Sequence, residues 1–234
     1  MARLQKFPTL SIIIPTLNEA KHLPLLLADL NAWPYDFELT IVDGGSKDLT
    51  ISIAQIQGVN VIKSSQKNRG YQLSIGALEA KCDWLLFLHA DSRLEKKWFK
   101  NLLKILNKKR SKNYAWYFDF RIKNHKLEFR ILEVAVALRS YFFQRPYGDQ
   151  GLLLHKELYH QSGGFSPLKI MEDLDLITRI TKSQKVKRIG SSIYTDDKKW
   201  GKSNIIRRAI TNARLRAKWR KGCNVDNLSK EYYS

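Results

Sequence analysis

The chain has 234 residues, of which 44% are hydrophobic and 27% charged, a composition typical of a globular protein with one large or two small domains. Its 41 basic and 22 acidic residues leave a net charge of +19, which favours an anionic partner such as nucleic acid, acidic lipid or a phosphorylated small molecule. Two cysteines are too few for a disulfide framework, no apolar run reaches the roughly 18 residues of a membrane span, and the N-terminus has no apolar signal core, so we expect a cytoplasmic protein.

The first half of the chain alternates between short apolar runs and segments with helical spacing. Continuous apolar runs that end at proline or glycine are typical of strands buried on both faces. Separated by helices, such strands predict a parallel sheet covered on both sides. The predicted strands are 10–15, 38–43, 59–64 and 83–91, and the predicted helices are 22–33, 49–57 and 70–81.

The second half has a different pattern. Apolar residues alternate over 115–122, which predicts a half-exposed strand, more typical of antiparallel pairing. A long helix is expected over 126–143 and a short strand over 150–155. Residues 172–184 begin with acids and end with bases, which suits a helix dipole. Residues 203–222 form a basic amphipathic pattern that predicts a final helix.

Polar residues follow the predicted strands, and ligands collect at the carboxyl ends of strands in parallel sheets. Asn18 and Glu19 follow the first strand, and Asp43 ends the second, directly before two glycines. Glycines there let the backbone approach a ligand, and the Asp43 carboxylate can accept hydrogen bonds from a ribose or a base edge. An aspartate that only caps a turn is the alternative interpretation.

His89 and Asp91 end the fourth apolar run, "FLHADS". A carboxylate with a histidine two residues before it can bind a hard divalent ion, and histidine suits manganese better than magnesium. A strand-end histidine that is hydrogen-bonded locally remains the alternative. Asp149 and Gln150 lie between two glycines at the entrance of a later strand, a stretch that is either a ligand contact or a bare turn.

The basic excess is concentrated near the C-terminus. Residues 182–221 hold 14 Lys and Arg against two Asp, which accounts for 12 of the 19 net charges. The apolar stripe of the last helix is Ile206, Ile210, Ala213 and Ala217, and its basic side is Arg207, Arg208, Arg214 and Lys218. Either the stripe packs on the core and the basic face is solvated, or the helix docks on an anionic membrane leaflet. Residues 93–112 form a second basic patch, interpreted as a solvated helix face.

Six motifs occur in a characteristic order: "SIIIPTLNEA" (11–20), "IVDGGSKDLT" (41–50), "RGYQLSIGA" (69–77), "FLHADS" (87–92), "YGDQG" (147–151) and "GGFSPLKIMEDLDLITR" (163–179). Together they closely resemble the family-two glycosyltransferases, over about residues 9 to 221. The "HAD" stretch and the tail "DDKKWGKSNIIRRAI" resemble most a bacterial subgroup associated with radical-SAM and selenoprotein genes.

The resemblance implies an α/β protein with the GT-A fold, a mostly parallel nucleotide-binding sheet flanked by helices. It implies one domain over 1–234, with a nucleotide-binding half at about 9–92, an acceptor half at about 93–200 and the basic helix at about 201–222. It also implies an inverting transfer of a sugar from a nucleotide-diphosphate sugar to an acceptor, with a divalent cation, Mg²⁺ or Mn²⁺, as cofactor.

The same resemblance implies roles for particular residues. The nucleoside would be surrounded by Pro15, Thr16, Asn18, Glu19 and Asp43, with Arg69 near the nucleotide. The family's Asp-x-Asp metal motif falls on His89–Ala90–Asp91, so its first aspartate is replaced by His89 while Asp91 is kept. The family's acidic pair matches Glu172 and Asp173, with Asp173 as the base that takes the acceptor proton. Lys199 and Trp200 would close over the diphosphate, and Asp149 and Gln150 would contact the donor sugar or the acceptor.

Other classes stay open on sequence alone. A non-catalytic basic module that binds membrane or nucleic acid fits the charge, but the chain has no stacking or base-reading motif, so no nucleic-acid partner is expected. A sugar nucleotidyltransferase shares the nucleotide-binding sheet but would carry a glycine-rich basic loop after the first strand, where this chain has "PTLNEAKH". A third possibility is an inactive homologue of a transferase, because His89 replaces the first aspartate of the metal motif. The nucleotide base, the sugar, the acceptor and the oligomeric state do not follow from the sequence.

Overall fold

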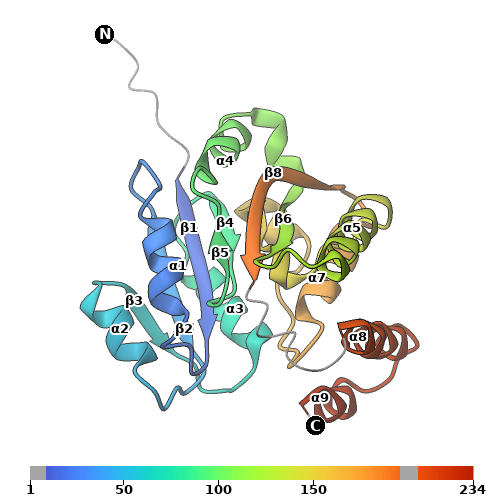
Figure 1. Cartoon of the computed structure of the whole chain (residues 1–234). Coiled ribbons are helices and arrows are strands. Elements are labelled where there is room, and N and C mark those ends of the chain that lie inside the picture. Colours follow the sequence, from blue (N-terminus) through green and yellow to red (C-terminus); the bar gives the residue numbers. More distant parts are fainter. Residues whose placement is uncertain (1–8, 196–204, 234) are drawn as a thin grey trace.

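A computed structural model describes residues 9–195 and 205–233, except for the side chains of residues 205–210 and 233. The described strands form one sheet in the order β3-β2-β1-β4-β7-β6-β8-β5, with helices packed around it (Figure 1). The strands are β1 (Leu10–Thr16), β2 (Glu38–Asp43), β3 (Asn60–Lys63), β4 (Trp84–Phe87), β5 (Arg93–Leu94), β6 (Ala115–Ile122), β7 (Leu152–His155) and β8 (Val186–Thr195). The helices are α1 (Leu23–Leu30), α2 (Thr50–Ile56), α3 (Arg69–Glu79), α4 (Phe99–Leu106), α5 (Leu127–Phe142), α6 (Lys156–Gln161), α7 (Glu172–Ile180), α8 (Ile205–Arg220) and α9 (Val225–Tyr233), with 3₁₀ turns at Lys109–Asn113 and Gly148–Gln150.

The parallel sheet predicted for the first half is confirmed. β1 pairs in parallel with β2 and β4, and β2 pairs in parallel with β3. Successive residues of β1 face opposite sides, so Ile12 packs in the core cluster that includes α1, whereas Ile13 packs in the cluster that includes α3. In the pairing of β1 with β2, Thr16 lies opposite Asp43, so both strands deliver their carboxyl ends to the same edge of the sheet.

The second half adds mixed pairing. β7 runs antiparallel to both β4 and β6, but β6 also pairs in parallel with β8. The antiparallel pairing expected for 115–122 is therefore correct on the side of β6 that faces β7. On the other side β6 pairs in parallel with β8, a strand that was not predicted. The prediction of a solvated helix face at 93–112 is confirmed for α4, which buries Leu102 and Ile105 while Lys100 and Lys104 are exposed.

The final helix differs from its predicted stripe. Ala213 is exposed, and Leu215 is instead fully buried against Ile170 and Leu228. The reason is α9, which the sequence analysis did not predict and which folds back on α8 to supply Leu228. The side chains of Ile206 and Ile210 lie outside the described residues. In the described part of the chain, no helix combines the length and the apolar character needed to cross a membrane.

Candidate active site

Two adjoining cavities lie at the carboxyl ends of the parallel strands. The larger, of about 470 Å³, is lined by the end of β1 together with Glu19, Lys67, Gln72 and Lys169, and is here named the β1 cavity. The smaller, of about 220 Å³, is lined by residues at the start of α7, by the turn before β7 and by α8 and α9, and is here named the α7 cavity. The two cavities share three lining residues, Arg69, His89 and Asp91.

The predicted nucleoside residues divide into two groups around the β1 cavity. Pro15, Thr16 and Glu19 line it, as does Arg69 at the start of α3. Asp43 does not line it, because the residue is buried and its carboxylate is hydrogen-bonded within the protein. Its oxygens accept hydrogen bonds from the Thr16 hydroxyl at 2.9 Å, from Gly45 N–H at 2.9 Å and from Ser46 N–H at 2.8 Å.

Asn18 likewise orders the rim and does not face the β1 cavity. Its side-chain oxygen accepts a hydrogen bond from Lys47 N–H at 2.8 Å, and its own N–H donates to the Ser46 hydroxyl. Its φ of 57° lies in the left-handed region, which asparagine tolerates better than most residues. Asp43 and Asn18 therefore hold the loops that follow β1 and β2, as the turn-capping alternative for Asp43 expects, and their contacts with a nucleoside stay a prediction.

His89 and Asp91 lie in the turn after β4, where Ser92 N–H donates to the His89 carbonyl at 3.0 Å. Asp91 is 7% exposed, and both side chains line both cavities. A Cβ added to Gly148 would lie 2.7 Å from His89 Nε2, so only glycine lets the backbone come this close to the imidazole. One carboxylate and one imidazole fit a divalent ion that takes its other ligands from phosphate and water. Within the described ranges, no group of three or more His, Cys, Asp or Glu residues could hold a metal by itself.

The start of α7 presents its two acids in different ways. Met171 precedes the helix with φ at 64°, an uncommon conformation for a residue with a side chain, and turns the chain into the cavity wall. Glu172 is fully buried and forms an ion pair with Arg69. Burial raises the pKa of Glu172, and the charge of Arg69 opposes that rise. Glu172 does not line the α7 cavity, so in this structure it positions Arg69 and does not face an acceptor.

Arg69 can reach Glu172 because the loop before α7 packs against the first turn of α3. The Asn68 side chain caps α3 by accepting from Tyr71 N–H at 3.1 Å, and it donates to the Pro167 carbonyl at 2.8 Å. A Cβ on Gly70 would lie 2.2 Å from the Ser166 carbonyl oxygen, so this approach requires glycine.

Asp173 lines the α7 cavity together with Asp91. Its Oδ2 accepts a hydrogen bond from Gly148 N–H at 2.5 Å, and its Oδ1 accepts from Leu174 N–H at 2.7 Å. The carboxylate is therefore held at a helix start, against the turn that also approaches His89. The role of Asp173 as the base stays a prediction.

Asp149 and Gln150 are adjacent but lie in different environments. Asp149 lines the α7 cavity, and its Oδ1 is inaccessible to solvent and has no hydrogen-bond partner among the described residues. Burial raises the pKa of Asp149, while the charge of Arg139 opposes the rise. Gln150 is 1% exposed, and its side-chain oxygen accepts from Arg139 at 2.8 Å and from the Ser140 hydroxyl at 2.9 Å. The prediction that Gln150 contacts donor or acceptor does not agree with this placement, because its amide joins α5 to the turn before β7.

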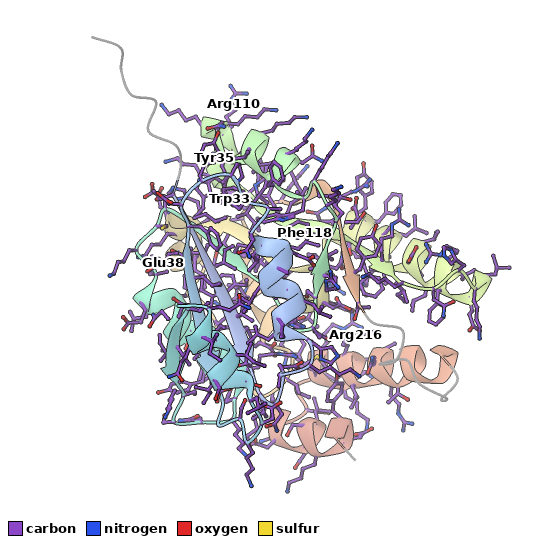
Figure 2. The ribbon with its side chains drawn as sticks, turned by 60° about the vertical axis from the view of Figure 1, so that its left-hand side comes forward. Trp33, Tyr35, Glu38, Arg110, Phe118 and Arg216 are labelled. Carbon is purple, nitrogen blue, oxygen red and sulfur yellow. The ribbon has the colours of Figure 1, made fainter. Side chains whose placement is uncertain are left out.

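The C-terminal helices contribute lining residues that the sequence pattern does not indicate. Asn212 and Arg216 of α8 and Tyr232 of α9 line the α7 cavity. Figure 2 shows Arg216 pointing from α8 toward the body of the molecule, where its guanidinium lies 4.6 Å from the ring centroid of Tyr147. Arg139 lies 3.5 Å from the centroid of the same ring. The sequence marks this helix as basic but does not distinguish Arg216 from its neighbours. The predicted contacts Lys199 and Trp200 lie outside the described residues.

Residues 11–169 match the family model described as Glycosyl transferase family 2, so more than half of the chain is covered and the chain belongs to that family. The chain is 41% identical over 100 residues to a PGL/p-HBAD biosynthesis glycosyltransferase of Mycobacterium tuberculosis (strain ATCC 25177 / H37Ra), a match that covers 37% of each chain. It is 34% identical over 93 residues to the 4,4'-diaponeurosporenoate glycosyltransferase of Staphylococcus haemolyticus, covering 37% of this chain and 25% of that protein. The matches thus span well under half the length of these curated relatives.

Solved structures show the same fold. The structure of S. aureus TarS 1–349 superposes with a TM-score of 0.64 at 17% identity, over 81% of this chain and 61% of that one. The mannosyltransferase PcManGT from Pyrobaculum calidifontis, in complex with GDP-Man and Mn²⁺, gives a TM-score of 0.64 at 17% identity, over 80% of this chain and 57% of that one. Both are GT-A glycosyltransferases, which confirms the predicted fold class. The resemblance to the radical-SAM and selenoprotein-associated subgroup stays a prediction.

Proposed function

We propose that this protein is a glycosyltransferase that moves a sugar, with inversion, from a nucleotide-diphosphate sugar to an acceptor hydroxyl. The observation that carries the proposal is the junction of the β1 and α7 cavities at Arg69, His89 and Asp91. A nucleotide sugar has a nucleoside, a diphosphate and a sugar in a row, and two cavities joined at charged residues provide a place for each. The similar structures of TarS with UDP-GlcNAc and of PcManGT with GDP-Man support this class of donor.

The nucleoside is assigned to the β1 cavity, against Pro15, Thr16 and Glu19. The diphosphate is assigned to the junction, where the guanidinium of Arg69 provides the planar donors that suit phosphate oxygens. Asp91, with His89, would hold the Mg²⁺ or Mn²⁺ ion, and such an ion neutralises the negative charge of a leaving diphosphate when bound.

The transfer itself is assigned to the α7 cavity. Asp173 accepts the proton of the acceptor hydroxyl while the oxygen attacks the sugar, a contribution of typically ~10²–10⁴-fold to the rate. Hydrogen bonds from two backbone N–H groups fix the direction of this carboxylate before the acceptor arrives. Glu172 acts through Arg69, because its buried charge holds the guanidinium at the junction. Asp149 contacts the transferred sugar or the acceptor.

The proposal places the protein in the cytoplasm, peripheral to the inner face of a membrane, with a lipid-linked acceptor. The basic C-terminal helix supports this placement, since each basic residue near an anionic lipid surface adds about 1 kcal/mol of attraction. Lys199 and Trp200, which lie a few residues before this helix in the sequence, are proposed to close over the diphosphate.

Calorimetric titration tests the proposal. Nucleoside diphosphates and their sugars are titrated into the protein, each with Mn²⁺, with Mg²⁺ and with a chelator. We expect one nucleotide to bind in a metal-dependent manner, and the bound ligand to raise thermal stability, by about 2.7 kcal/mol at a hundred times its dissociation constant. Salt-dependent binding of DNA with no affinity for any nucleotide sugar would instead favour a nucleic-acid-binding module.

A further inference from the structure

Helix α5 carries a broad apolar face that the described residues leave open to solvent. The residues recur at intervals of three and four, the spacing that places side chains on one face of a helix, and each is between 51% and 74% exposed. They are Leu127, Ile131, Val134, Leu138, Tyr141 and Phe142, followed by Phe143 directly after the helix. Glu128 is the one charged residue among the exposed positions of 127–143.

The opposite face of α5 is fixed to the sheet, so the helix cannot rotate to bury this stripe. Phe129 and Val136 pack against Phe120 of β6. Glu133 is 3% exposed, and its carboxylate accepts from Ile122 N–H at 2.7 Å and pairs with Arg121 at 2.9 Å. These contacts hold the apolar stripe in its outward orientation.

We propose that α5 lies in the surface of an anionic phospholipid bilayer, with its apolar face inserted among the lipid chains. A helix of 16 residues is about 24 Å long, which suits an in-plane helix and is too short to span the hydrocarbon core. The aromatic residues Tyr141, Phe142 and Phe143 widen the face at one end, where a bilayer interface accommodates aromatic rings. Exposed Lys123 and Lys126 precede the helix and can contact lipid phosphates.

Net charge favours a bilayer over a second copy of the chain as the occupant. Each copy carries +19, so self-association would bring two strongly positive molecules together, whereas an anionic leaflet attracts them. In both views α8 runs below α5 on the same side of the molecule (Figure 1, Figure 2). Membrane docking was one of the two alternatives that the sequence left for the basic α8, and α5 supplies the apolar surface that a docking helix needs.

The position of α5 links the bilayer to the active site. Arg139 of α5 stacks on Tyr147, and Tyr147 lines the α7 cavity. A bilayer against α5 therefore lies beside the cavity that holds Asp173, so an acceptor carried by a membrane lipid reaches the base without leaving the bilayer surface. This last step rests on the proposed function, but the insertion of α5 does not.

Vesicle sedimentation tests the insertion. The full chain is mixed with vesicles of phosphatidylcholine alone or of phosphatidylcholine and phosphatidylglycerol in equal parts, at low and at high salt. The test variant is Leu138→Asp with Phe142→Asp, and the matched control is Ile56→Asp with Leu78→Asp, two residues that are 85% and 75% exposed on other helices. All four positions are exposed, so the folded structure tolerates both pairs of changes.

We expect the parent and the control to sediment with anionic vesicles, and the α5 variant to bind at least about 10-fold more weakly for each side chain changed. Equal binding by the α5 variant and the control overturns the inference, as does a parent that fails to bind anionic vesicles at low salt. A parent that forms a dimer in sedimentation velocity, which the α5 variant abolishes, assigns the face to a second copy and also overturns it. Calorimetric nucleotide binding by the same preparations separates these outcomes from a failure of the proposed function.

Discussion

The two halves of the molecule use their polar residues differently. In residues 9–92, Asp43 and Asn18 are bonded to neighbouring backbone and hydroxyl groups, and they shape the rim of the β1 cavity. In the second half, Asp149 and Asp173 line the α7 cavity, where Arg216 also lies. A polar residue that follows a strand can therefore serve to hold a loop in place, as Asp43 and Asn18 do. The acids available for chemistry are those that line a cavity, as Asp149 and Asp173 do.

The largest expected effect tests whether the chemistry belongs to the second half. Asp173→Asn preserves shape and removes the proton acceptor, so the transfer rate should fall by about 10²-fold or more. Donor affinity should change little, because the carboxylate acts on the acceptor. Transfer is measured with any acceptor that the wild type uses, and donor affinity by calorimetry. Glu172→Gln is the comparison variant, and it should weaken donor binding because it releases Arg69. If the Asp173→Asn enzyme turns over normally, Asp173 is not the base.

The second effect concerns the junction between the halves. Asp91→Ala should weaken metal-dependent nucleotide binding by at least about 10-fold. Loss of a group that only orients a metal ligand already costs about 10- to 100-fold in metal affinity, and loss of the ligand itself should cost no less. The measurement is nucleotide affinity with Mn²⁺ and with a chelator. Unchanged manganese dependence in the variant contradicts the assignment of Asp91.

His89 offers a sharper form of the same test. His89→Asp restores the commoner Asp-x-Asp pattern and replaces a nitrogen ligand by an oxygen ligand, which magnesium prefers. The ratio of magnesium-supported to manganese-supported activity should therefore rise. If that ratio stays where it was, His89 has a structural role beside Gly148.

The third effect asks whether α8 is part of the active site. Arg216→Ala should weaken donor or product binding by roughly 10- to 100-fold, the range for loss of a charged hydrogen bond. Arg214→Ala is the matched control, because Arg214 lies two positions away on the same helix and is exposed. Equal effects of the two substitutions would mean that α8 contributes general positive charge only.

What the sequence could predict follows the same division. Buried parallel strands have continuous apolar runs, so β1 to β4 and the edge that carries His89 and Asp91 were predictable from local pattern. The first turn of α7 was found through its acids. The burial of Leu215 was not predictable, because one of its partners, Leu228, lies on α9 and the contact forms between two helices. The hydrogen bond between Gln150 and Arg139 was not predictable for a related reason: Arg139 lies in α5, and no local pattern reveals that pairing. The exposed face of α5 has the same periodicity as a core face, so only the structure shows that nothing in the described chain covers it.

The smallest expected effect is on stability, and it separates a buried acid kept for function from one that holds the fold. Burial raises the pKa of Asp149 above its unfolded value, so the folded state keeps this proton to higher pH than the unfolded state does. Its contribution to stability is therefore full below an unfolded pKa of about 3.9 and is lost as pH rises through the folded pKa. Asp149→Asn removes that loss. Urea unfolding in metal-free buffer should therefore show a variant as stable as the parent near pH 4 and about 1 kcal/mol more stable at neutral pH.

Asp175→Asn is the opposite case, because it breaks a 2.6 Å ion pair with Arg179 and should reduce stability. If Asp149→Asn is instead less stable than the parent at neutral pH, the Asp149 charge has a structural partner, and its assignment to the sugar or the acceptor loses its support.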